Sequence, residues 1–205
     1  MNPKLLLATR NRGKVREYCS LFQGAPFWLT TLAEEGINVE VSETGHTLEE
    51  NARLKATAYA AGNQFLVIAD DSGLEVDALG GEPGSLSARY GGKDTSDEEK
   101  IALLLSRLQE VPWEKRSARF RCVIAIALGS RLAGLCEGEC SGIISFEPRG
   151  DHGFGYDPVF YLPELGKTMA ELSLEEKNQV SHRGKAVQKA LQFLESLWEE
   201  NRKLE

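Results

Sequence analysis

Features that mark a membrane-bound or exported protein are missing from this sequence of 205 residues. Its longest uninterrupted apolar run spans residues 122–128, far short of the roughly 20 residues that a membrane-spanning helix needs. Near the N-terminus, Thr9 and Arg10 interrupt the apolar residues before a signal-peptide core is complete. We therefore expect a soluble, cytoplasmic protein with no membrane partner.

Histidines, paired cysteines and an excess of positive charge are also lacking. The chain has 3 histidines and 4 cysteines, and no two cysteines follow the C-x-x-C spacing of zinc and redox sites. Lysine and arginine total 24 against 31 aspartates and glutamates, so the net charge is −7. A general nucleic-acid binder normally carries a basic surface. These shortages argue against a zinc site and a nucleic-acid partner, and they favour free thiols in a reducing compartment.

What remains is the composition of a folded domain, with 41% hydrophobic and 27% charged residues. Buried-strand patterns predict strands at residues 5–8, 65–69, 120–128 and 132–136. Helical patterns alternate with them at residues 15–22, 47–61, 96–108 and 187–198, and capping boxes open two of these helices at Thr47 and Ser96. This order predicts an α/β or α+β fold in which helices cover a sheet, formed by a single domain over residues 1–205.

A basic segment lies between the first predicted strand and the first predicted helix. It consists of Thr9, Arg10, Asn11, Arg12, Gly13 and Lys14. Three cations next to a helix N-terminus predict a phosphate-binding site, because backbone N–H groups and the helix dipole add to the side-chain charge. It is not a Walker loop, since Val15 follows Lys14 where serine or threonine belongs. A solvated basic turn is the alternative.

Two neighbouring carboxylates, Asp70 and Asp71, follow the predicted strand at residues 65–69. Carboxylates at the end of a buried strand require a compensating cation, and Mg²⁺ prefers such oxygen ligands together with substrate phosphates. The Asp-Ser-Gly sequence also suits a helix cap or an Asx-turn. Glu43, in the polar segment 42–45, is a candidate for a further metal carboxylate, and a solvated acidic turn is its alternative.

Two later segments are also candidates for binding. Residues 153–158 place glycines around Phe154 and Tyr156, an arrangement that suits stacking on a base as well as a tight turn over the core. Ser181 is predicted to cap the last helix, which places His182 and Arg183 in its first turn. Cations are disfavoured there unless an anion is close, so this position favours function.

Taken together, these segments closely resemble the inosine/xanthosine triphosphate pyrophosphatase family. The matching stretches are residues 8–17, 43–56, 69–90, 153–160 and 171–186, in the family's order and spacing. The resemblance implies an elongated α/β fold whose mixed sheet is flanked by helices, with two lobes around a central cleft. It also implies a homodimer that hydrolyses the purine nucleoside triphosphates ITP, dITP and XTP to the monophosphate and pyrophosphate with Mg²⁺.

The resemblance assigns a role to each matching residue. Residues 9–14 would bind the triphosphate, Asp71 would be the general base and a metal ligand, and Ser72 would contact the substrate. The base and sugar would be enclosed by Phe154, Gly155, Tyr156, Asp157, Lys177, His182 and Arg183. Ser42 departs from the pattern, because many bacterial members have a glutamate there. Either Glu43 or a water molecule would then complete the metal site beside Asp71.

The residues themselves leave two other functions open. A nucleotide-binding sensor module would use the basic segment and the aromatic side chains without needing paired aspartates. A pyrophosphatase for pyrimidine or modified nucleotides would share the phosphate-binding residues but not a purine pocket. Release of pyrophosphate from ITP, present with Mg²⁺ and absent with EDTA, separates an enzyme from a sensor.

Overall fold

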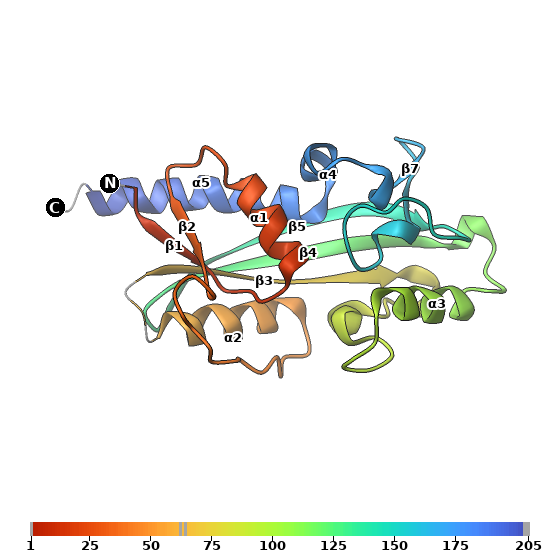
Figure 1. Cartoon of the computed structure of the whole chain (residues 1–205), viewed down its shortest axis with the longest axis horizontal. Helices are drawn as coiled ribbons and strands as arrows, with labels where there is room; N and C mark the ends of the chain where they lie inside the picture. The colour runs from red at the N-terminus through yellow and green to blue at the C-terminus, as the bar shows by residue number, and fades with distance from the viewer. Residues whose placement is uncertain (1, 62, 64, 203–205) are drawn as a thin grey trace. The chain divides into compact units, whose positions relative to one another are not determined.

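The structure is a computed structural model that describes residues 2–61, 63 and 65–202. It contains a seven-stranded sheet in the order β2-β1-β3-β4-β5-β6-β7 (Figure 1). The strands are β1 Lys4–Leu7, β2 Trp28–Thr31, β3 Leu66–Val76, β4 Ser117–Leu128, β5 Arg131–Ile144, β6 Phe160–Leu162 and β7 Lys167–Thr168. The α-helices are α1 Arg12–Leu21, α2 Leu48–Ala60, α3 Asp97–Arg107, α4 Leu174–Val180 and α5 His182–Arg202.

The sheet is mixed. β1 pairs in parallel with both β2 and β3, whereas the β5–β6 and β6–β7 pairs are antiparallel. The mixed sheet and its helices confirm the predicted α/β class. The four predicted helices are also confirmed, as α1, α2, α3 and α5. None of the helices in the described residues is long and apolar enough to cross a membrane.

The chain divides into two compact units. The first comprises Met1–Asp71, Cys122–Gly138 and Arg183–Glu205, and the second comprises Ser72–Arg121 and Glu139–His182. Within the first unit, side chains alternate between the two faces of the strands. Leu5 and Leu7 pack in one apolar cluster with side chains of α1 and α5, whereas Leu6 packs in another with side chains of α2. Helices thus cover both faces of this part of the sheet (Figure 1).

The start of α1 differs from the sequence prediction. Asn11 caps the helix by accepting a hydrogen bond from the Lys14 backbone N–H at 3.0 Å. Arg12, Gly13 and Lys14 therefore form its first turn, although they were expected to precede the helix. The cause is the asparagine, whose side-chain oxygen satisfies an N–H group that has no partner within the helix.

Strand β3 is longer than predicted and does not end before Asp70. It continues through Asp70, Asp71, Ser72 and Gly73 to Val76, which rules out the alternative of a turn or helix cap at these residues. Gly73 leaves room within this strand for another backbone segment, which approaches it closely. A Cβ at Gly73 would lie only 2.2 Å from the Gly84 carbonyl oxygen.

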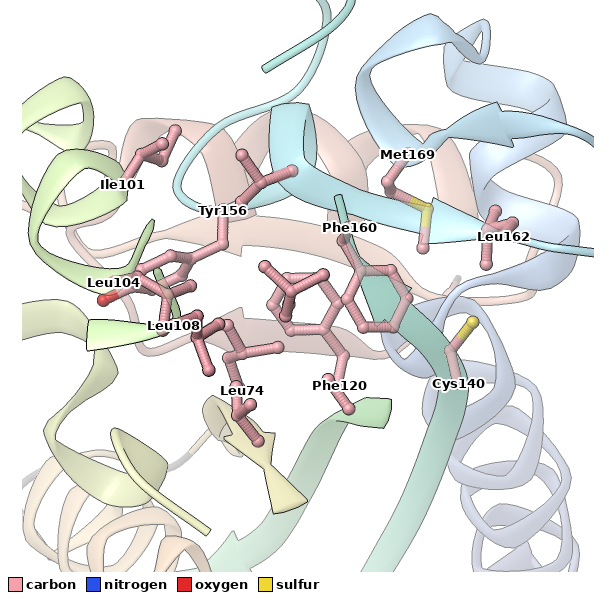
Figure 2. Close-up of a cluster of buried hydrophobic side chains, with 14 of the residues drawn as sticks. Leu74, Ile101, Leu104, Leu108, Phe120, Cys140, Tyr156, Phe160, Leu162 and Met169 are labelled. Carbon is pink, nitrogen blue, oxygen red and sulfur yellow. The ribbon is translucent and has the colours of Figure 1, made fainter. Parts of the chain in front are cut away.

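The second unit has its own apolar core (Figure 2). Leu74 from β3 and Leu104 from α3 are fully buried there. Phe120 and Phe160 lie with their ring centroids 4.4 Å apart, and Tyr156 packs in the same cluster. The 3.6-residue spacing of Ile101, Leu104 and Leu108 explains why α3 presents one continuous apolar face to this core.

Candidate active site

Asp70 lies in a fully buried position on β3 and is surrounded by cations. Its Oδ2 atom is 2.9 Å from the Lys14 Nζ and 3.5 Å from an Arg183 guanidinium nitrogen. Burial by itself raises the pKa of this carboxyl, but Lys14, Arg183 and Lys55 outweigh burial and lower the pKa to about 2. Asp70 is therefore ionised and fixed, and its carboxylate holds the Lys14 ammonium in place.

Asp71 interacts instead with α2. Its Oδ1 accepts a hydrogen bond from Lys55 Nζ at 3.0 Å, and its Oδ2 accepts one from the Asn51 amide at 3.3 Å. Burial raises the pKa of Asp71, and Glu43 raises it further, against the opposing effect of Lys55 and Lys14. A carboxylate whose pKa is raised accepts a proton more readily than an ordinary aspartate.

The two aspartates point to opposite faces of β3, since successive side chains of a strand alternate. Ile68, Asp70 and Cys122 lie on the side of α1 and α5, whereas Ala69 and Asp71 lie on the side of α2. The expectation that both would sit together at the end of a strand is therefore wrong. Each carboxylate instead has its own primary lysine, Lys14 or Lys55.

The basic segment reaches the carboxylates because β1 ends beside β3. Leu7 pairs with Ile68, and the Ala8 N–H donates to the Ile68 carbonyl at 2.8 Å. The chain then turns into α1, which places Lys14 next to Asp70, whereas Asp71 pairs with Lys55. Arg12 lies exposed at the start of the helix. Arg10 donates to the carbonyls of Ile37 and Val39, so these two hydrogen bonds hold its side chain against that loop.

Glu43 and Asp71 converge on one cation in the first unit. Lys55 Nζ lies 2.7 Å from the Glu43 carboxylate and 3.0 Å from that of Asp71, so this ammonium occupies a position between the two. Within the described ranges, no group of three or more histidine, cysteine, aspartate or glutamate side chains could hold a metal by itself. Two carboxylates nevertheless suit Mg²⁺, which binds through one or two of them together with substrate phosphates.

Arg183 shows why cations are tolerated at the start of α5. Its guanidinium is buried and forms ion pairs with Glu17 of α1 and with Asp70. Burial lowers the pKa of this group, but Glu17 and Asp70 outweigh it, so the pKa is raised and the charge is retained. Cations at a helix N-terminus need a nearby anion, and here Glu17 and Asp70 of the protein itself supply it. The predicted placement of His182 and Arg183 in the first turn of the last helix is confirmed.

Among the predicted base-binding residues of the second unit, Asp157, Lys177 and His182 are buried. Lys177 pairs with Asp157, and its ammonium lies 5.0 Å from the centre of the Phe154 ring. Asp157 also accepts a hydrogen bond from the Phe154 N–H at 2.9 Å. His182 stacks on Phe120 with 4.7 Å between ring centroids.

Tyr156 belongs to the core of this unit. This is the alternative to stacking on a base that the sequence left open for residues 153–158. The Tyr156 side chain is only 4% exposed, and its hydroxyl donates to the Ser87 carbonyl at 2.9 Å. Gly155 donates its N–H to Asp97 at 2.7 Å. The glycine-rich segment is thus held by α3 and by the second unit's own core.

Comparison with known proteins identifies the family of this chain. The model of the Ham1 family matches residues 5–193, which is most of the sequence. The chain belongs to the Ham1 family. The resemblance found in the sequence motifs is therefore confirmed.

Other members of the Ham1 family are similar over nearly their whole length. The dITP/XTP pyrophosphatase of Geobacillus kaustophilus is 52% identical over 197 residues, which cover 96% of this chain and 95% of that protein. The solved structure of the Staphylococcus aureus Ham1 protein has a TM-score of 0.83 at 44% identity, covering 94% of this chain and 98% of that one. A HAM1 protein from Coxiella burnetii has a TM-score of 0.85 at 38% identity, with 95% and 99% covered.

Sequence reasoning missed two polar residues of this candidate site. Asn51 and Lys55 both contact Asp71, yet neither was predicted to do so. They lie four residues apart on α2 and therefore share one face of the helix. The signal that could have found them is the spacing of an asparagine and a lysine four residues apart among the alanines of this helix.

Proposed function

We propose that this Ham1 family chain hydrolyses dITP, XTP and ITP to the nucleoside monophosphate and pyrophosphate. Its relatives include proteins named dITP/XTP pyrophosphatase, and they match the chain over almost its full length. The observation that carries the proposal is the pairing of two lysines with three carboxylates in the first unit, Lys14 with Asp70 and Lys55 with both Asp71 and Glu43. Lys14 and Lys55 lie within 3.0 Å of Asp70, Asp71 or Glu43.

The phosphates are bound by the basic segment. A triphosphate carries about four negative charges, which must be neutralised before a water molecule attacks phosphorus. Lys14 supplies one positive charge at a position fixed by Asp70, and Arg12 is exposed in the same helical turn. The N–H groups in the first turn of α1, other than the Lys14 N–H that Asn11 caps, add further donors. Thr9, Arg10, Asn11 and Gly13 are proposed to contact the phosphates from the same segment.

Asp71 is the proposed general base. Its carboxylate takes a proton from a water molecule whose oxygen forms a bond to the α-phosphorus. The bond from that phosphorus to the bridging oxygen of the β-phosphate breaks, and pyrophosphate leaves with the bonding electron pair. The raised pKa of Asp71 and its fixed hydrogen bonds suit this task.

A divalent cation, Mg²⁺ in our proposal, fits the carboxylates of Asp71 and Glu43. When bound, it neutralises phosphate charge and makes the phosphorus more electrophilic. Lys55 already bridges these two carboxylates, so the pair tolerates a cation between its oxygens. Ser42 is exposed and precedes Glu43 in the loop.

Recognition of the base and sugar is proposed to fall to Phe154, Gly155, Asp157, Lys177, His182 and Arg183, with Ser72 also contacting the substrate. Tyr156 is left out of this group because it belongs to the core of the second unit. The Lys177–Asp157 ion pair beside the Phe154 ring offers polar groups and an aromatic face together. A homodimer remains a prediction from the family resemblance.

A panel of nucleoside triphosphates tests the proposed function. We expect pyrophosphate from dITP, XTP and ITP in the presence of Mg²⁺, little from ATP or the pyrimidine nucleotides, and none after EDTA. Excess Mg²⁺ added back is the control for chelation. Tight nucleotide binding without pyrophosphate release would favour a sensor, and preferential cleavage of pyrimidine nucleotides would favour the other pyrophosphatase.

Lys14→Ala is expected to lower kcat/KM for ITP by at least tenfold, because a charge-assisted contact to phosphate contributes about 1.5–3 kcal/mol. The measurement is steady-state pyrophosphate release. Arg16→Ala is the matched control, since Arg16 lies exposed on the same helix and should change kcat/KM by less than about twofold. A change below twofold in Lys14→Ala would show that the basic segment does not bind the phosphates.

A further inference from the structure

Asn51 occupies an unusual position for an amide side chain, because it is completely buried within a helix of the first unit. Its Nδ2 donates to Asp71 Oδ2 at 3.3 Å, and its Oδ1 accepts the Gly45 N–H at 2.8 Å. Burial of an amide is costly unless its hydrogen bonds are satisfied. Both ends of this side chain are used, one toward β3 and one toward the loop that carries Glu43.

The surroundings fix which way the amide points. The Gly45 N–H can only donate, so the oxygen of Asn51 must face it, and the amide nitrogen then faces Asp71. Gly45 also has to be a glycine for this contact to form. A Cβ built there would lie 2.7 Å from Asn51 Oδ1 and 2.6 Å from the Glu50 Cβ.

Asn51 and Lys55 together hold both oxygens of Asp71. Lys55 binds Oδ1 and Asn51 binds Oδ2, so rotation of the carboxylate would break one contact or the other. Lys55 carries a charge that phosphate oxygens also attract, whereas the neutral Asn51 amide is attracted to them less strongly. Asn51 is therefore suited to keep Asp71 oriented when a nucleotide is present.

We infer that Asn51 is a positioning residue, which fixes the Asp71 carboxylate toward the attacking water and couples that carboxylate to the loop of Glu43. The inference rests on the proposed function. A displacement of about 1 Å in a reacting group can cost on the order of 10²-fold in rate, and loss of a supporting hydrogen bond typically costs about 10- to 100-fold.

Two substitutions separate positioning of Asp71 from simple anchoring of the loop. Asn51→Asp is isosteric and keeps an oxygen for the Gly45 N–H, but it replaces the donor to Asp71 with a second oxygen. Asn51→Ala removes both contacts without adding a charge. Asn63→Asp is the matched control, because the Asn63 amide donates to the Tyr59 carbonyl just beyond the same helix.

The measurements are kcat and KM for ITP, normalised to the folded fraction, and the affinity for a non-hydrolysable α,β-methylene analogue of ITP by calorimetry. We expect kcat to fall at least tenfold in both Asn51 variants, with the analogue affinity changed by less than about threefold. Asn63→Asp should match the wild type in both. If Asn51→Asp does not fold, the kcat and analogue affinity of Asn51→Ala relative to the wild type test the inference.

A loss of kcat smaller than fivefold in either folded Asn51 variant would overturn the inference. A loss of analogue affinity as large as the loss of kcat would also overturn it, because it would indicate that Asn51 helps to build the binding site. Failure of the proposed function is distinguishable from both outcomes, because the wild type itself would then release no pyrophosphate from ITP.

Discussion

Asp71→Asn is expected to lower kcat for ITP hydrolysis by about 10²- to 10⁴-fold, the range that general-base catalysis contributes. The amide has nearly the same shape, but it cannot take the proton from the attacking water. Nucleotide binding should persist, since Lys14 and the start of α1 are unchanged. Steady-state kinetics and calorimetry with the non-hydrolysable analogue measure the two effects separately.

The control for this substitution is Asp77→Asn. Asp77 is an exposed aspartate immediately after β3, where its carboxylate accepts a hydrogen bond from Ser117. We expect its kcat to equal that of the wild type within about twofold. Turnover near the wild-type value in Asp71→Asn would exclude Asp71 as the base, whatever its position in the structure.

Asp70→Asn is expected to cost about 3 kcal/mol or more of folding free energy, an effect on stability. The substitution leaves the charges of Lys14 and Arg183 without the carboxylate between them, at a site that is 0% exposed. Removing one member of a buried ionic group is costly because the remaining charge is left uncompensated. Chemical denaturation followed by circular dichroism measures the loss.

Two comparisons show whether the buried charges cause that loss. Glu147→Gln removes an exposed ion pair with Arg149 and should cost less than about 1 kcal/mol. Adding Lys14→Met to Asp70→Asn removes one uncompensated cation and should recover part of the stability. A loss below 1 kcal/mol in Asp70→Asn would mean that Asp70 does not hold this group of charges together.

Both predictions depend on an arrangement that local sequence patterns describe only in part. Periodicity and capping boxes were enough to predict α1, α2, α3 and α5, because an amphipathic face and an N-cap are encoded within a few residues, but the short helix α4 was not predicted. The spacing of Ser96 and Glu99, for example, forms a complete capping box at the start of α3. The same kind of reasoning located the basic segment beside a helix N-terminus.

Local patterns failed at Asp70 and Asp71, where Asp-Ser-Gly favours a turn but the structure continues a strand. The outcome depends on long-range contacts: the Leu74 N–H donates to Ser87, and the Gly84 backbone lies against Gly73. No window of neighbouring residues contains these partners, since they lie 11 to 13 positions away. Tertiary pairing therefore overrides the turn preference.

The sequence by itself determined which chemical groups this protein has: the basic segment of residues 9–14, the paired aspartates and the family motifs in their order. Only the tertiary structure decided how those groups are paired. Strand alternation sends Asp70 to Lys14 and Arg183 and sends Asp71 to Lys55 and Asn51. Ion pairs and hydrogen bonds act over a few ångströms in space, and folding brings together residues that are far apart in the chain, such as Asp70 and Arg183, 113 positions apart.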